Sequence, residues 1–264
     1  MTLPEVSVVT LTRDRPDALL RAVRSVAAQT GVAVEQIVVG DDADHLRDPD
    51  HLAQLRAVLP GIVIENVARP AAPEYRSARL GRLRNRGIAL ATGEFVGQLD
   101  DDNTFAPDHL SSLVRALTDN PHVEVAHSWR LLVDPAGQPY VPDGEDPWHP
   151  DPDPERRAIS YRYLCEHGVF TPGSNVVRDR FASGGTVLAR IDTSEYLVRR
   201  RFHAGTGFPE TFSPARQKLE WTEDFVFALQ LARAGVEVVC TERATVNYTM
   251  GGFSNSHALQ SDAG

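Results

Sequence analysis

The sequence has few cysteines, no excess of positive charge and no long apolar run. Only Cys165 and Cys240 are present, far apart and without CxxC spacing. This excludes a disulfide framework or a zinc knuckle and favours two reduced thiols. Lysine and arginine number 27 against 36 acidic residues, so the formal net charge is −9. Such a balance argues against a broad nucleic-acid groove, and we expect no nucleic-acid partner.

Signals for export or membrane insertion are also lacking. The N-terminus has no basic segment followed by an apolar stretch of signal-peptide length. No apolar run reaches the roughly 18 residues that a membrane helix needs. We therefore expect a cytoplasmic protein without a membrane span. The 264 residues, 42% of them hydrophobic, are enough for one α/β domain over residues 1–264.

The first 120 residues alternate β-rich runs with amphipathic helical patterns. Strands are expected at 6–11, 36–40, 61–67 and 94–99. Helices are expected after Pro16, around 52–59, at 76–92 and after Pro107. This order predicts an α/β fold with a mostly parallel twisted sheet flanked by helices. Ligands of such sheets gather outside the carboxyl ends of the strands.

The second half is less regular. Residues 134–154 are rich in proline and predict a functional loop or a flexible lid. Residues 168–215 give no clear assignment, whereas 220–235 predict a helix and 236–240 a strand. No glycine-rich phosphate loop, HExxH motif or Ser-His-Asp order is present.

Three aspartates, Asp100, Asp101 and Asp102, directly follow the fourth expected strand. Neighbouring carboxylates repel one another, and burying them without compensation is costly. A divalent cation that prefers oxygen ligands would relieve this repulsion. Mg²⁺ in particular binds through one or two carboxylates while substrate phosphates fill other positions. The alternative is an exposed acidic turn ahead of the next helix.

Four segments, in their order along the chain, resemble the inverting family-2 glycosyltransferases of the GT-A fold. They are VSVVTLTRDRPDALLRAVRSVAAQT, IVVGDDAD, RNRGIALATGEFVGQLDDDN and WTEDFVFALQLARAG. The resemblance covers residues 5–120 well and 218–248 moderately, and it is weak between them. It implies a nucleotide-sugar-binding half at 1–120, an acceptor-binding half at 121–250 and a polar tail at 251–264.

The resemblance also implies an activity. A sugar would pass from a nucleotide-diphosphate donor, which we expect to be a UDP-sugar, to a hydroxyl of a small-molecule or saccharide acceptor. Mn²⁺ or Mg²⁺ would be the cofactor. The oligomeric state stays open, with a homodimer as one alternative.

The same resemblance gives the acids donor-binding roles. Asp102 would be the direct metal ligand, with Asp100 as a further candidate. Asp101 or Asp100 would contact the ribose or the water molecules of the metal. The acid that closes the second strand would read the nucleobase, which points to Asp41, with Asp42 as the alternative.

Residues near the same strands complete the expected nucleotide site. Thr10 and Thr12 would line the nucleotide pocket, and Arg84 and Asn85 would lie beside the nucleotide. Many relatives carry a Tyr-Asn pair after the first strand, where this chain has Thr12 and Arg13. The plane of Arg13 could stack on the base instead.

Glu223 and Asp224 precede an apolar helical stripe. Acids in a first helical turn are favourable in any protein, which is the structural interpretation. The resemblance places the catalytic base in this pair: Asp224, with Glu223 as the alternative. A carboxylate can deprotonate the attacking hydroxyl. We favour inversion, with a retaining route left open, and expect Trp221 to pack on the acceptor.

Arginines and histidines give more ambiguous signals. Arg76 and Arg79 predict a salt-bridged surface. The arginines at 199–201 predict either a clamp on the leaving diphosphate or a charged edge strand. His203 or His257 could serve as an extra metal ligand.

Two other functions compete with sugar transfer. A nucleotidyltransferase also combines a nucleotide-binding sheet with acidic metal ligands, but usually has a glycine-rich loop after the first strand, which is missing here. A non-catalytic nucleotide-sugar-binding module would keep the sheet without turnover. The aspartate cluster together with the Glu-Asp pair favours the enzyme.

Overall fold

The centre of the fold is a mixed sheet. A computed structural model describes residues 4–183, 186–252 and 255, and within them this sheet has nine strands. Its order is β3-β2-β1-β4-β10-β6-β11-β5, with β7 paired to β6. The strands are β1 (Val6–Thr12), β2 (Val34–Asp41), β3 (Val63–Val67), β4 (Phe95–Gln98), β5 (Thr104–Phe105), β6 (Val125–Val133), β7 (Val176–Val177), β10 (Tyr196–Arg199) and β11 (Val238–Thr249).

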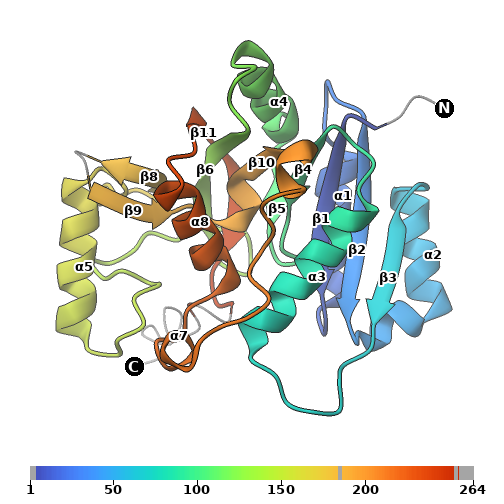
Figure 1. Ribbon diagram of the computed structural model, residues 1–264, viewed down its shortest axis with the longest axis horizontal. Helices are drawn as coiled ribbons and strands as arrows, with labels where there is room; N and C mark the ends of the chain where they lie inside the picture. The colour runs from blue at the N-terminus through green and yellow to red at the C-terminus, as the bar shows by residue number, and fades with distance from the viewer. Residues whose placement is uncertain (1–3, 184–185, 253–254, 256–264) are drawn as a thin grey trace.

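Helices cover both faces of this sheet, and α3 and α8 lie side by side on the face nearer the viewer in Figure 1. A separate hairpin of β8 (Arg180–Ser183) and β9 (Thr186–Arg190) lies next to α5, far from β3. The helices are α1 (Pro16–Ala27), α2 (Pro49–Val58), α3 (Arg76–Leu90), α4 (His109–Asp119), α5 (Pro154–Glu166), α6 (Arg200–His203), α7 (Pro214–Lys218) and α8 (Glu223–Arg233), with 3-10 turns η1 (Asp44–Arg47) and η2 (Thr193–Glu195).

The prediction of a mostly parallel sheet is confirmed. Strands β3, β2, β1 and β4 are parallel neighbours, and β6 and β11 are parallel too. Strand β10 runs antiparallel between β4 and β6. This insertion joins the two parallel groups into one sheet.

Burial on both faces explains why β1 forms a central strand. Val6 and Val8 pack with side chains of α1 and α4, whereas Val9 and Leu11 pack with Leu83 of α3. Successive strand residues point to opposite faces, so a strand buried on both sides reads as a continuous apolar run. Parallel pairing then brings the carboxyl ends of β1, β2 and β4 to one edge of the sheet.

The arginines at 199–201 lie at the opposite end of β4, which corrects both of their predicted roles. Arg199 Nη1 is 3.1 Å from Glu94 Oε1, just before β4 begins, and Arg201 Nη2 is 2.7 Å from Glu124 Oε1. They are remote from the aspartate cluster, so they form no clamp there. Arg199 ends β10, which is a central strand rather than an edge strand, and Arg200 and Arg201 begin α6.

Residues 134–154 form a packed loop. Asp146 is buried, accepts a hydrogen bond from Ser160 Oγ at 2.7 Å and pairs with Arg190 at 3.3 Å. These contacts hold the part of the loop around Asp146 against α5 and β9, whereas residues 135–139 are exposed. Both cysteines are free, as expected. None of the helices in the described ranges combines the length and apolar character needed to span a membrane.

Gly87 allows α3 to approach the sheet closely. A Cβ atom at this position would lie 2.3 Å from Val9 Cγ1 and 3.3 Å from Val39 Cγ2. Both valines are fully buried and cannot move without disturbing the sheet. The glycine of the Arg-Asn-Arg-Gly segment therefore sets the distance between helix and sheet.

We expect Gly87→Ala to lower stability. Overpacking a close contact costs about 1–3 kcal/mol, which exceeds the roughly 1 kcal/mol that alanine gains over glycine inside a helix. The melting temperature should fall by several degrees in thermal denaturation. Gly61→Ala is the control, since a Cβ there meets no atom within 4 Å. Equal melting temperatures for the two variants would contradict this account of α3.

Candidate active site

A cleft of about 1030 Å³ opens at the carboxyl edge of the sheet. Segments from the whole length of the chain form its walls, so it exists only in the folded protein. Residues that line the cleft include Thr12, Arg13, Arg15, Asp41, Arg69, Arg79, Arg84, Asp100, Asp101, Asp102, Arg130, Trp148, Asp192, Trp221, Glu223, Asp224 and Tyr248.

The aspartate cluster begins where β4 ends. Asp101 is 1% exposed; its Oδ2 accepts a hydrogen bond from Thr12 Oγ1 at 2.8 Å, and its Oδ1 lies 2.5 Å from Arg15 Nη2. Asp102 pairs with the other terminal nitrogen of Arg15. Burial, opposed by the charge of Arg15 and assisted by Asp100 and Asp101, raises the pKa of Asp102 to about 7. Arg15 therefore does not fully offset the cost of charging Asp102 in this cluster.

Arg84 connects this cluster to α8. Its Nη2 is 2.9 Å from Asp100 Oδ1, and its Nε is 3.1 Å from Glu223 Oε1. Burial raises the pKa of Glu223 to about 7, against the lowering effect of Arg84 and together with repulsion from Asp224. Arg84 and Glu223 are both almost fully buried, so this pair fixes the helix start against the end of β4.

Asp224 lies in the first turn of α8 and lines the cleft, half-buried. Its Oδ1 accepts a hydrogen bond from the Phe225 amide at 2.7 Å. Another acid of the cleft, Asp192, is affected by the charge of Asp224. Burial raises the pKa of Asp192 to about 6; Arg130 opposes this shift, whereas repulsion from Asp100 and Asp224 adds to it. Acids from β4, α8 and the start of η2 thus share one cleft.

Asp41 lies at the end of β2 between two arginines. Its carboxylate accepts from Arg79 Nε at 3.0 Å and from Arg69 Nε at 3.2 Å. Burial would raise the pKa of Asp41, but the hydrogen bonds and charges of both arginines outweigh it and hold this pKa below its usual value. Arg79 is 8% exposed, so the expectation of a solvated surface residue is wrong for it.

Several candidate residues lie elsewhere. Thr10 is fully buried and accepts a hydrogen bond from Gln36 at 2.9 Å inside the sheet. Asn85 donates to Phe208 O at 2.9 Å and accepts from the Phe208 amide at 2.8 Å. Asp42 pairs with Arg47 outside the cleft. The first two therefore support the fold, whereas Thr12, Arg13 and Arg84 do line the cleft.

His203, suggested as a metal ligand, lies outside the cleft. His203 is stacked on Phe227, with 6.1 Å between ring centroids, and its Nδ1 is 3.1 Å from Thr206 O. The cleft lining does not include it. His257 lies outside the described residues.

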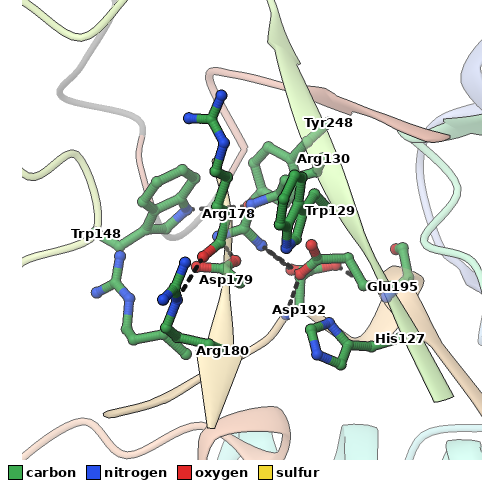
Figure 2. A network of polar contacts seen from close by, with 12 residues as sticks. His127, Trp129, Arg130, Trp148, Arg178, Asp179, Arg180, Asp192, Glu195 and Tyr248 are labelled. Carbon is green, nitrogen blue, oxygen red and sulfur yellow. Dashed lines mark hydrogen bonds and ion pairs between the residues drawn. The ribbon is translucent and has the colours of Figure 1, made fainter. Parts of the chain in front are cut away.

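A buried charge network, shown in Figure 2, extends inward from the cleft, and its members Arg130 and Asp192 line the cleft. Arg130 on β6 pairs with Asp179 at 2.7 Å and with Asp192 at 3.3 Å, and its Nη1 is 3.7 Å from Glu195 Oε2. Its guanidinium carbon also lies 4.5 Å from the Trp148 ring centroid and 4.8 Å from that of Tyr248. Sequence patterns did not predict this network, because its members are far apart along the chain and share no motif.

This geometry can be compared with known proteins. The profile of Glycosyl transferase family 2 matches residues 7–161, more than half of the 264 residues. The chain belongs to glycosyl transferase family 2. The matched range includes the aspartate cluster and Asp41 and ends before Glu223 and Asp224.

One curated relative of this family 2 chain is the succinoglycan biosynthesis protein ExoO of Rhizobium meliloti, 32% identical over 112 residues. The match covers 42% of this chain and 29% of ExoO. The O-antigen biosynthesis protein RfbC of Myxococcus xanthus is 28% identical over 256 residues, which is 93% of this chain and 19% of RfbC. The chain thus spans less than a third of either relative.

Solved structures show that the chain has the GT-A fold. S. aureus TarS in complex with UDP-GlcNAc aligns with a TM-score of 0.59 at 17% identity, covering 96% of this chain and 60% of that one. Mannosyltransferase PcManGT from Pyrobaculum calidifontis, in complex with GDP-Man and Mn²⁺, gives a TM-score of 0.59 at 15% identity, with coverages of 97% and 60%. At such identities the likeness concerns the fold.

The donor atoms of this family 2 cleft fit a divalent cation. Asp101 Oδ1 is buried and has no hydrogen bond, only its ion-pair contact with Arg15, and the Asp102 side chain is 20% exposed. Over the described residues, no group of three or more His, Cys, Asp or Glu side chains could hold a metal by itself. Mg²⁺ commonly has such sites, with one or two carboxylates and the remaining oxygens from phosphates and water.

The charge network predicts pH-dependent stability. Burial and the charge of Asp179 raise the pKa of Glu195 well above its usual value. A raised acid pKa means stability that is present below the unfolded pKa and is lost as the pH rises through the folded pKa. We therefore expect Glu195→Gln, which stays neutral, to raise the melting temperature at pH 8 by about 2–4 °C for each kcal/mol recovered.

At about pH 3.5 the same variant should differ little from the unaltered protein, because Glu195 is then largely protonated in both the folded and the unfolded state. Glu166→Gln on the exposed end of α5 is the control and should change stability by at most about 0.5 kcal/mol at either pH. A loss of stability in Glu195→Gln at pH 8 would show that its charge stabilises Arg130 instead.

Proposed function

We propose that this chain transfers a sugar from a UDP-sugar to a hydroxyl of a saccharide or other ring-bearing small molecule, with Mn²⁺ or Mg²⁺ and with inversion. The observation that carries the proposal is the shared cleft. Asp101 and Asp102 at the end of β4 and Asp224 at the start of α8 line it together, and Arg84 joins the two elements. The aspartates after β4 would suit binding of the cation, and Asp224 would suit removal of the acceptor proton.

The donor would occupy the side formed by β1, β2 and β4. Asp102 and Asp101 would hold the divalent cation, which when bound neutralises charge on the leaving diphosphate. Asp41 can accept an N–H of the base, while Arg69 and Arg79 beside it can donate to base carbonyls. A uracil ring offers both kinds of group. The plane of Arg13, exposed in the same cleft, can stack on the base.

Asp224 would be the general base. It is half-buried in the cleft and accepts from the Phe225 amide, whereas Glu223 is buried and bound to Arg84. A base must reach the proton that it removes, and a carboxylate fixed on a guanidinium is poorly suited to accept one. Attack from the α8 side, with the diphosphate leaving toward β4, gives inversion.

The acceptor would lie against the aromatic wall. Trp148, Trp221 and Tyr248 line the part of the cleft near β6 and α8. Aromatic rings present apolar faces together with a polar N–H or O–H group, which suits the mixed surface of a sugar ring. The names of the curated relatives ExoO and RfbC refer to succinoglycan and O-antigen biosynthesis, which also favours a saccharide.

Asp224→Asn should separate binding from chemistry. We expect transfer to fall by about 10²–10⁴-fold, because the amide cannot take the proton, while UDP binding with Mn²⁺ changes less than about twofold. Release of UDP from a panel of UDP-sugars, with saccharide acceptors and MnCl₂, measures transfer, and calorimetry measures binding. Asp119→Asn, exposed at the end of α4, is the control. A full transfer rate in Asp224→Asn would refute the base assignment.

Asp102→Ala, unlike Asp224→Asn, should impair the binding of UDP with Mn²⁺. We expect it to abolish the increase in UDP affinity that Mn²⁺ provides, since the variant lacks the carboxylate that would hold the cation. Calorimetry with and without MnCl₂ measures that increase. Unchanged metal-dependent binding would contradict the placement of the cation. Pyrophosphate among the products, instead of UDP, would identify a nucleotidyltransferase.

A further inference from the structure

Arg15 lies where the cleft is most acidic. It precedes α1 in the loop after β1, and its two terminal nitrogens contact Asp101 and Asp102 separately, the former at 2.5 Å. Its guanidinium thus faces the same carboxylate oxygens that the proposed function assigns to the divalent cation. Both cations cannot hold these oxygens at once.

We propose that Arg15 is a built-in counter-cation that holds Asp101 and Asp102 until a divalent cation and a nucleoside diphosphate bind, and that it then moves to the diphosphate. This inference rests on the proposed function. It makes Arg15 a residue that couples metal binding to donor binding.

The charges of the three side chains support such an exchange. When both carboxylates are ionised, they and the guanidinium of Arg15 carry a net charge of −1, so Arg15 offsets part of their repulsion. A divalent cation added alone would make the group positive and would have to displace Arg15 or repel it. A diphosphate removes this conflict, because it supplies negative charge and oxygen ligands for both cations.

The position of Arg15 allows it to move. Its side chain is 48% exposed, and as the N-cap residue of α1 it makes no side-chain capping hydrogen bond. Arg84, by contrast, is 5% exposed and fixed between Asp100 and Glu223. A guanidinium forms paired hydrogen bonds to phosphate oxygens as readily as to carboxylates. Arg15 can therefore exchange one anion for the other with a change in its own rotamers.

The alternative is that Arg15 is a permanent partner of the aspartates, either as a structural ion pair or in place of a metal. The two ideas differ in what happens when the arginine is removed. If Arg15 were a permanent partner, its removal would not increase the affinity for Mn²⁺. A counter-cation that competes for the same oxygens would, once removed, leave them open to Mn²⁺.

The test is a titration with MnCl₂ followed by electron paramagnetic resonance, which measures free Mn²⁺, with and without UDP. We expect Arg15→Gln to bind Mn²⁺ alone about tenfold more tightly than the unaltered protein, and to bind UDP in the presence of Mn²⁺ about tenfold more weakly. The factor by which UDP tightens Mn²⁺ binding should fall accordingly. Arg15→Lys, which keeps the charge but not the fork of donors, should lie between the two.

Arg201→Gln is the matched control. It also removes one exposed guanidinium from a pair with an acid, at the opposite end of the sheet, and should leave both affinities unchanged. Melting temperatures measured alongside show whether each variant is folded. If Arg15→Gln does not fold, Arg15→Lys decides the question by the same two affinities.

Each remaining outcome counts against the inference. Unchanged or weaker Mn²⁺ binding by Arg15→Gln, while the unaltered protein binds Mn²⁺ with UDP, would overturn the counter-cation role and leave the proposed function intact. Tighter binding of both Mn²⁺ and UDP would overturn the movement to the diphosphate. Failure of the unaltered protein to bind Mn²⁺ even with UDP would overturn the proposed function and, with it, this inference.

Discussion

The arrangement of the cleft depends on one buried guanidinium. Arg84 lies on α3, and it bonds to Asp100 at the end of β4 and to Glu223 at the start of α8. Losing one partner of a buried ion pair costs about 3–5 kcal/mol, because the other charge is left unpaired. The end of β4 and the start of α8 are therefore held at a fixed separation by contacts that are costly to break. A displacement reaction needs such a fixed separation between the attacking and leaving groups.

The contact with Arg84 also explains why Glu223 and Asp224 have different surroundings although they are neighbours in the sequence. Glu223 is turned inward to Arg84, whereas Asp224 stays in the cleft at the helix start. Sequence alone cannot separate the two, since both suit a first helical turn and both belong to the Glu-Asp pair. The partner that distinguishes them comes from α3, far away in the sequence.

Local patterns predicted the parts of the fold that depend on local physics. The apolar run of β1 and the helix over α3 were predicted correctly, because burial on both faces of a strand and on one face of a helix leaves a pattern in consecutive residues. Thr10 and Asn85 do not line the cleft, although their position along the chain suggested it. Thr10 is on the same face of β1 as Thr12 but lies two residues farther from the strand end, where Gln36 donates to it, and Asn85 bonds to Phe208.

What the sequence could not reveal is the pairing of arginines with acids across long separations. Arg79 is predicted as a surface residue of a helix, yet it is buried beside Asp41 and lines the cleft. Arg15 follows a strand without a glycine-rich loop and still reaches the aspartates. These pairs bring guanidinium groups into the cleft of a chain whose net charge is negative. Arginines brought into the cleft from distant segments compensate its acids, and a bound diphosphate would then meet guanidinium groups that already lie within the cleft.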